Sequence, residues 1–219
     1  MAGAIPLSDA SRRPTNFPIV TLSIVIINLV VFVLELANGD AFVSRWAMVP
    51  ANVSSGRDLV TVLTAMFMHA SWSHIIGNMI FLWAFGPEIE DEMGPLRYAI
   101  FYLLGGIAAA ATQVAFYPHS TVPNLGASGA IAAVMGAFLV TFPRDNIRTI
   151  LVVFVFISVA YVPAVILIGL WFLSQLWSAG AVAPQAPTGV AYLAHIGGFL
   201  FGAVFARLFE RGRRMSQPF

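Results

Sequence analysis

The sequence predicts an all-α membrane protein built as one bundle of six transmembrane helices, with both termini in the cytoplasm. Of its 219 residues, 59% are hydrophobic and only 10% are charged, and the mean hydropathy is +0.85. Ordinary soluble domains carry about 25% charged residues. A bilayer-spanning helix needs about 20 mostly apolar residues, so six of them would use roughly 120 positions. The remaining positions suffice for loops and tails.

Composition also excludes several functions. The chain has no cysteine, which excludes disulfides, thiolate zinc sites, iron–sulfur clusters and a cysteine nucleophile. A net charge of +1 argues against a nucleic-acid surface. The H-E-x-x-H pattern of a zinc protease helix is absent. We therefore expect the lipid bilayer as a partner, with no metal, no organic cofactor and no nucleic acid.

The first three spans begin after a polar tail, residues 1–16. The run 19–36 is too long for a signal-peptide core and lacks a small-residue cleavage pattern, so it is predicted to be a retained helix. The second span, 59–85, is apolar but is interrupted by histidine, serine and asparagine. The third span, 96–116, follows Gly94 and Pro95.

Three further apolar runs complete the bundle, at 128–142, 150–173 and 190–209. The predicted domain therefore covers residues 17–209, between the N-terminal tail and a basic cytoplasmic tail at 210–219. No repeat or separate soluble domain is apparent.

Arginine decides the orientation, because cytoplasmic loops carry an excess of positive charge. In the six-span arrangement only Arg45 and Arg57 fall on one side. All other basic residues fall on the opposite side: Arg12, Arg13, Arg97, Arg144, Arg148, Arg207, Arg211, Arg213 and Arg214. Both termini are thus predicted to be cytoplasmic, and the loops 38–58, 117–127 and 174–189 face outward.

Small residues gather on two of the predicted helices. Gly129, Ala133 and Ala137 follow one another at four-residue spacing, and Gly198 and Gly202 do the same on the last span. Such faces let helices approach closely in lipid. We interpret them as packing surfaces.

Few polar side chains interrupt the spans, and intramembrane polar groups are functional candidates. His74 and Asn78 are four residues apart and share a helix face. Ser128 opens the fourth span, and His195 lies early in the sixth. Because spans two, four and six all descend from the outer side, these residues lie at similar depth. Taken singly, Ser128 is also a good helix cap, and His195 could simply bond a neighbouring helix.

Together the four residues indicate nucleophilic catalysis. A serine needs an adjacent base, and a neutral imidazole can take its proton. The helix N-terminus at Ser128, with His74 and Asn78, offers donors for an oxyanion. None of the ten acidic residues lies deep in the outer half of a span, which argues against an aspartic protease. A triad acid could come only from Glu35, Asp40 or Asp58, so a Ser/His dyad is the simpler hypothesis.

These motifs resemble the rhomboid family of intramembrane serine proteases over about residues 17–209. His69–Asn78 is similar to the family's second helix, Gly126-Ala127-Ser128-Gly129 matches its G-x-S-G motif, and Ala194–Gly198 matches A-H-x-x-G. The resemblance implies a rhomboid-type six-helix bundle. It also implies that Ser128 is the nucleophile and His195 the base, with His74, Asn78 and the Ser128 backbone N–H at the oxyanion site.

The resemblance further implies an intramembrane serine endopeptidase that cleaves single-span transmembrane proteins near their outer end. It implies a multi-pass protein of a bacterial plasma (inner) membrane. The fifth helix with loop 174–189 is a candidate lateral gate, and the Gly/Ala surroundings of Ser128 favour a small residue before the scissile bond. The alternatives are an inactive rhomboid-like module that binds transmembrane helices, and a small transporter. The transporter would require an intramembrane charge or an internal repeat.

Two sites depart from the family pattern, and a third, Glu90, matches a position to which the family gives a structural role. Ala132 stands where many relatives have an aromatic ring that stacks on the catalytic histidine. Val60-Thr61 stands where many bacterial relatives have Trp-Arg, so Arg57, Trp72 or Trp46 would have to anchor the first loop. Glu90 falls where the family has a structural glutamate, with a solvated charged turn as the alternative.

Overall fold

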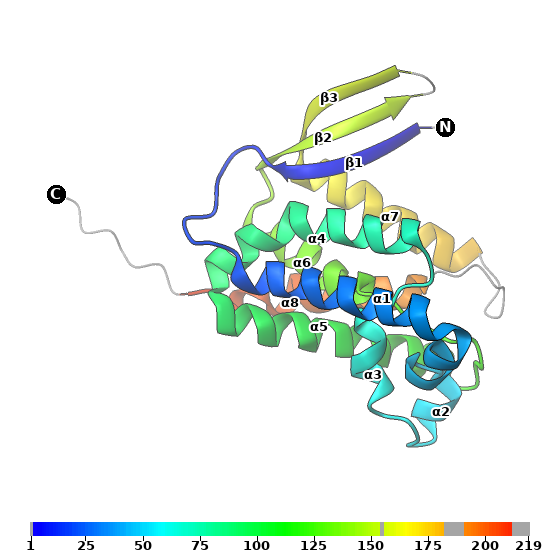
Figure 1. Ribbon diagram of the computed structural model, residues 1–219. Coiled ribbons are helices and arrows are strands. Elements are labelled where there is room, and N and C mark those ends of the chain that lie inside the picture. Colours follow the sequence, from blue (N-terminus) through cyan, green and yellow to red (C-terminus); the bar gives the residue numbers. More distant parts are fainter. Residues whose placement is uncertain (1, 154–155, 182–190, 212–219) are drawn as a thin grey trace.

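The protein is mostly helical, and the computed structural model describes residues 2–153, 156–181 and 191–211. Long helices lie side by side, with a small sheet against one flank of the bundle (Figure 1). The long helices are α1 (Ile19–Trp46), α4 (Trp72–Met93), α5 (Pro95–Phe116), α6 (Ser128–Thr141), α7 (Ala164–Ala181) and α8 (Tyr192–Phe209). Between α1 and α4 the chain forms the short helices α2 (Pro50–Ser54) and α3 (Thr61–Thr64) and the 3₁₀ turn η1 (Ala65–Phe67).

Membrane character is confirmed by the length and composition of the helices. Within the described residues, α1, α5, α7 and α8 are the four helices long and apolar enough to cross a bilayer. Helix α6 has only 14 residues, and α4 carries His74 and Asn78 along its apolar course. The six-span count and the cytoplasmic placement of the termini stay predictions.

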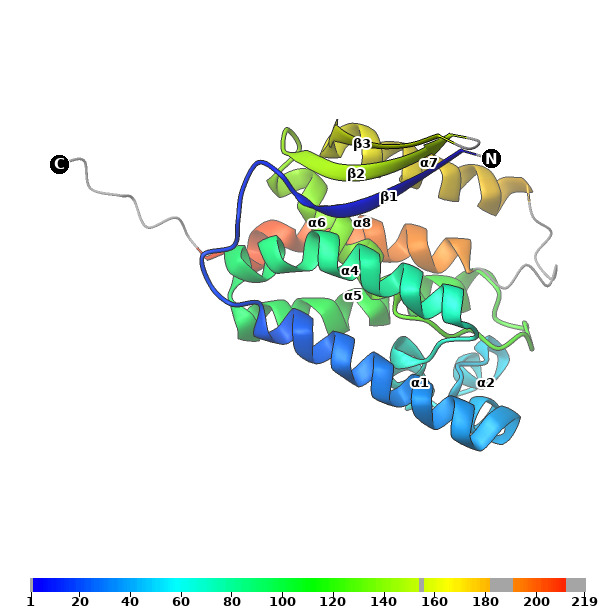
Figure 2. The same ribbon diagram turned by 45° about the horizontal axis from the view of Figure 1, so that its top comes forward.

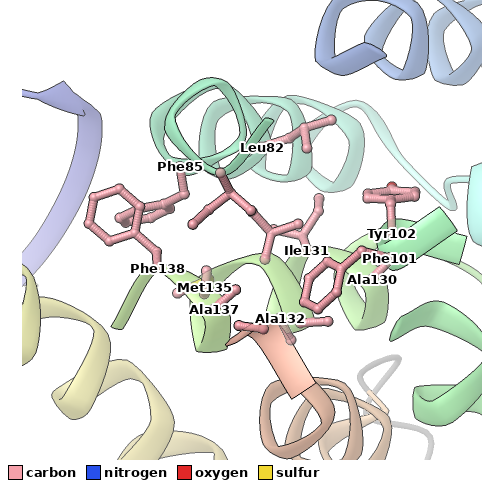
Figure 3. Close-up of a cluster of buried hydrophobic side chains, with 14 of the residues drawn as sticks. Leu82, Phe85, Phe101, Tyr102, Ala130, Ile131, Ala132, Met135, Ala137 and Phe138 are labelled. Carbon is pink, nitrogen blue, oxygen red and sulfur yellow. The ribbon is translucent and has the colours of Figure 1, made fainter. Parts of the chain in front are cut away.

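The core is built around α6, which lies in the middle of the bundle among α4, α5, α7 and α8. Every residue from Ala130 to Phe138 is buried, as expected for a helix that is apolar all round. Figure 3 shows the ring of Phe85, from α4, beside that of Phe138, from α6, with Leu82 farther along α4. The rings of Phe85 and Phe138 pack edge to face, with centroids 5.1 Å apart.

The predicted small-residue faces are confirmed as the contact between α6 and α8. A Cβ atom added at Gly198 would lie 2.1 Å from the carbonyl oxygen of Gly129, and one at Gly202 would lie 1.9 Å from that of Ala133. Both distances are far below a van der Waals contact. The two backbones therefore touch directly, and only glycine is compatible with this approach.

The predicted second span, 59–85, is wrong in its boundaries. The long helix begins only at Trp72, because Ser71 is extended and its side chain caps the helix by accepting a hydrogen bond from the His74 N–H. Upstream, the His69 N–H donates to both carboxylate oxygens of Glu35, at 3.0 and 3.1 Å. The polar interruptions seen in the sequence thus mark a helix start, and the helix continues to Met93.

The fifth span, 150–173, and the all-α class are also corrected. Strands β2 (Asn146–Val153) and β3 (Phe156–Pro163) form an antiparallel hairpin, in which Val153 faces Phe156 and Asn146 faces Pro163. Helix α7 starts only after Pro163 and runs to Ala181. Residues 146–163 are rich in valine, isoleucine and aromatic side chains, which favour strands. Their apolar character alone does not separate a strand from a helix.

The N-terminal segment contributes a third strand, which was not expected. Strand β1 (Ala2–Asp9) pairs antiparallel with β2, with a register shift between Pro6 and Ser8. Proline lacks an N–H, so it is tolerated at such an irregular edge position. The tail predicted for 1–16 is therefore ordered over β1, while most of the tail predicted for 210–219 lies outside the described residues.

The sheet lies over α4 and α7, with β1 against α4 and β3 leading into α7 (Figure 2). Arg12, just after β1, holds this end of the sheet. Its guanidinium forms an ion pair with Asp145 and lies 3.8 Å from the Phe142 ring centroid.

Two acidic side chains at this end of the sheet have shifted pKa values. Burial raises the pKa of Asp9 to about 6. Burial also acts to raise the pKa of Asp145, but the hydrogen bonds from Arg12 outweigh it and hold that pKa below its usual value.

Candidate active site

Ser128 is the first residue of α6, and a tight turn delivers it there. Gly126 has a φ of 137°, which side chains rarely adopt, and its N–H donates to the Ala65 carbonyl at 2.8 Å. Asn124 and Met48 exchange two backbone hydrogen bonds that hold the preceding loop. Because a helix's first N–H groups have no intrahelical acceptor, the Ser128 N–H is free to bind a ligand atom.

His195 on α8 meets Ser128 directly. Its Nε2 atom lies 2.7 Å from the Ser128 Oγ atom, and the close packing of α6 on α8 brings them together. Both side chains are half-buried. With Nε2 accepting the serine proton, Nδ1 carries the hydrogen of the neutral ring. The pair predicted from the sequence is thus within hydrogen-bonding distance.

His74 approaches the same site from the start of α4. Its Nδ1 atom accepts from the Ala70 N–H at 3.4 Å, which leaves Nε2 as the donor. A Cβ atom added at Gly126 would lie 3.0 Å from this Nε2 and 3.5 Å from the Ser128 Oγ. The bare face of Gly126 therefore leaves a small space between a potential donor and the serine oxygen.

Asn78 lies one helical turn after His74 and is buried, at 8% exposure. Its Nδ2 atom is also buried and has no hydrogen-bond partner within the described part of the chain. A buried unpaired amide is costly. This donor group is therefore available to a ligand. Asn78 lies four residues after His74, so the two side chains lie on the same face of α4.

The other side of His195 is held by residues that the sequence reasoning missed. Its Nδ1 atom lies 2.8 Å from the Oε1 atom of Gln175 on α7, and the Trp171 ring lies beside it, with centroids 5.9 Å apart and planes inclined by 35°. Ala132, the position that lacks the family's aromatic residue, is fully buried. The sequence does contain a signal for this contact, because Gln175 is a polar residue within an otherwise apolar run. It was overlooked because the fifth span was ended at Leu173.

None of the acids considered for a triad is the partner of His195 Nδ1. Glu35 accepts from the His69 backbone, and Asp58 accepts from the Asn52 side chain. Glu90 is structural, as the resemblance implied: its carboxylate accepts from the backbone N–H groups of Val20 and Thr21 at 2.8 and 2.7 Å. It thereby caps the start of α1 and is only 2% exposed, so the solvated-turn alternative does not hold.

A cavity of about 60 Å³ opens beside Ser128, lined mainly by small side chains that include Ala65, Gly126 and Ala194. Within the described residues, no group of His, Asp and Glu side chains is arranged to hold a metal ion.

The apolar helices indicate a membrane protein. The serine hydrogen-bonded to a histidine on a neighbouring helix has the geometry found in serine hydrolases. Comparison with known families gives the more specific answer: the Rhomboid domain model matches residues 56–211. The chain therefore belongs to the rhomboid family.

Three relatives illustrate the range of that family. The chain is 36% identical over 145 residues to RHOMBOID-like protein 12, mitochondrial, of Arabidopsis thaliana, covering 58% of this chain and 43% of the relative. It is 27% identical over 209 residues to Rhomboid protein 1, mitochondrial, of Saccharomyces cerevisiae, covering 91% and 55%. It is 25% identical over 186 residues to Rhomboid protease GlpG of Yersinia pestis, covering 85% and 61%. The chain spans about half the length of these relatives.

These relatives correct one expectation. The sequence predicts a bacterial plasma membrane, but two of the relatives, from a plant and a yeast, are named as mitochondrial proteins. The resemblance to the family therefore does not imply a bacterial setting, and that prediction is wrong. The rhomboid protease relatives do support a hydrolase family for the chain.

Proposed function

We propose that this chain is an intramembrane serine endopeptidase that cleaves transmembrane-helix substrates near their outer end. The observation that carries the proposal is the 2.7 Å contact between His195 Nε2 and Ser128 Oγ at the N-terminus of α6. A serine so placed has its base in hydrogen-bonding reach and free backbone donors beside it. Family membership supports peptide bonds as the substrate.

In the first half of the reaction, Ser128 attacks the scissile carbonyl carbon while His195 Nε2 takes the hydroxyl proton. The carbonyl oxygen becomes an oxyanion, which accepts hydrogen bonds from the Ser128 N–H, the His74 Nε2–H and the Asn78 amide. Collapse of the tetrahedral intermediate breaks the C–N bond, and His195 gives its proton to the leaving amine. An acyl ester on Ser128 remains.

In the second half, a water molecule enters the position that the amine has left. His195 takes one of its protons as the oxygen attacks the ester, and returns a proton to Ser128 Oγ when the ester bond breaks. The new carboxyl end of the substrate leaves. This cycle uses only side-chain and backbone groups of the protein, together with one water molecule.

The membrane-spanning character of the substrate is part of the proposal. Helices α1, α5, α7 and α8 are long and apolar enough to lie in a bilayer, and peptide carbonyls inside an intact helix are already hydrogen-bonded. Substrates whose helices contain proline or glycine near the outer end unwind at lower cost. The small cavity beside Ser128 favours a small side chain before the scissile bond.

The test is cleavage of a single-span substrate with a helix-breaking residue, by purified protein in liposomes. Wild type is compared with Ser128→Ala, His195→Ala and Ser23→Ala, the last changing an exposed serine of α1 that bonds only its own helix. Loss of cleavage in the two site variants alone is expected. If correctly folded wild type cuts none of several substrates and a serine-reactive probe fails to label Ser128, the proposal falls and the helix-binding module becomes the better explanation.

A further inference from the structure

The orientation of His195 is a question separate from its distance to Ser128. An imidazole ring rotates about its side-chain bonds, and it is a base for serine only when Nε2 faces the hydroxyl and the hydrogen sits on Nδ1. Many rhomboid relatives are expected to use an aromatic ring for this purpose, but the corresponding residue here is Ala132. Another group must restrain the ring.

We propose that Gln175 on α7 is the positioning residue for His195, holding the imidazole in its productive tautomer and rotation. The proposal rests on the proposed protease function and deepens it. Its basis is the 2.8 Å separation between Gln175 Oε1 and His195 Nδ1. An amide oxygen accepts and never donates, so it selects the tautomer with hydrogen on Nδ1. That tautomer leaves Nε2 free to accept from Ser128.

The amide itself is held in one orientation by its neighbours. Gln175 Nε2 donates to the Ser174 Oγ at 3.0 Å, and the Ser174 hydroxyl donates to the Trp171 carbonyl at 2.6 Å. An amide turned the other way would bring its NH₂ group against Nδ1–H, and would place its oxygen on a hydroxyl already engaged as a donor. The hydrogen-bond chain therefore directs Oε1 toward the histidine.

Burial and packing add to this restraint. Gln175 is 9% exposed, so water does not readily replace its oxygen at Nδ1. Trp171, four residues earlier on α7, shares its helix face, and its ring lies beside the imidazole. The Phe172 and Phe199 rings stack with centroids 4.2 Å apart, which fixes α7 against α8 next to the site.

In the proposed reaction, Gln175 also stabilises the imidazolium form of His195. When His195 takes the serine proton, the ring becomes an imidazolium, and its Nδ1–H bond to the amide oxygen strengthens. Hydrogen bonds to charged groups contribute more than neutral ones. Loss of the amide oxygen should therefore lower kcat by about 10- to 100-fold. Little effect on KM is expected, because Gln175 contacts the Nδ1 side of His195 and the Nε2 side faces Ser128.

The experiment compares Gln175→Met, Gln175→Glu and the control Gln113→Met in liposomes. Methionine keeps the length of the side chain and removes the acceptor, while glutamate keeps an oxygen. The control makes the same exchange at a buried glutamine of α5. The readouts are kcat and KM for a single-span substrate, the rate at which a fluorophosphonate labels Ser128, and the pH dependence of kcat.

We expect Gln175→Met to lose kcat and labelling rate together, with KM within about twofold of wild type. Gln175→Glu should recover most of the rate at alkaline pH and move the acidic limb of its profile to higher pH, because a carboxylate stabilises the imidazolium. A Gln175→Met enzyme with wild-type kcat overturns the proposal, as does a Glu variant that neither recovers activity nor shifts the limb. Failure of the wild type to cleave or label would instead refute the protease function.

Discussion

A methyl group added at Gly198 tests how closely the site depends on the approach of α8 to α6. The added Cβ would lie 2.1 Å from the Gly129 carbonyl oxygen. Reaching an ordinary contact of 3.4 Å requires α8 to withdraw by 1.3 Å. Gly198 is three residues from His195, and Gly129 adjoins Ser128. A rigid withdrawal would lengthen the Nε2–Oγ distance from 2.7 Å to about 4.0 Å, beyond a hydrogen bond.

The expected result for Gly198→Ala is a fall in kcat of about 100-fold, since a misplacement of about 1 Å is enough for that loss. Overpacking should also destabilise the bundle by about 1–3 kcal/mol. Cleavage of a single-span substrate in liposomes measures the first effect, and the thermal unfolding midpoint measures the second.

The matched control is Gly169→Ala on α7, where an added Cβ meets nothing within 4 Å. It makes the same exchange in a membrane helix without touching a neighbour, so its activity should equal that of wild type and its unfolding midpoint should not fall, because alanine favours a helix more than glycine does. A Gly198→Ala protein that retains at least half of the wild-type kcat would show that α6 and α8 do not fix the dyad through this contact.

Two further predictions concern the small space beside Gly126 and the N-terminal strand. Gly126→Ala should reduce cleavage by about 100-fold with unchanged membrane insertion, because its Cβ would lie 3.0 Å from His74 Nε2 and its φ of 137° disfavours a side chain; steady-state cleavage measures this, and a fully active variant contradicts it. Burial raises the pKa of Asp9 to about 6, so the docking stability that its protonated form provides is complete below about pH 4 and is lost as pH rises through about 6. Hydrogen exchange over residues 2–9 should therefore quicken between about pH 5 and 7 after correction for intrinsic rates, and Asp9→Asn should remove the change; an identical pH response in that variant would refute the assignment.

Much of the site follows from the sequence because its parts sit on well-marked helices. Ser128 opens a short apolar helix after Gly126, and Gly198 follows His195 on a small-residue face. Helix periodicity and glycine spacing are local signals, and they sufficed to predict that α6 and α8 pack closely. The hydrogen bond between the two residues depends on this packing.

The parts that were missed depend on contacts distant in the chain. Residues 146–163 are apolar enough for a helix, and the pairing of β2 with β1, more than a hundred residues earlier, was not visible in local periodicity. The predicted span therefore began 14 residues, about four turns, before the start of α7, and it ended at Leu173. Gln175 therefore lay in the predicted loop 174–189, where a polar residue is ordinary and does not indicate a functional site. An error in one helix boundary thus hid the hydrogen-bond partner of His195.

The site divides the restraint of His195 between two helices. The glycine contacts of α8 with α6 set the distance of the ring from Ser128, because backbone atoms on both sides leave no room for adjustment. Those contacts do not determine how the ring is turned about its own side-chain bonds. That freedom is removed by α7, through the Gln175 oxygen and the adjacent Trp171 ring. Displacement of α7 would therefore release the orientation of His195 while leaving the contact between α8 and α6 in place, so in the proposed mechanism α7 would determine whether His195 is turned to act as the base.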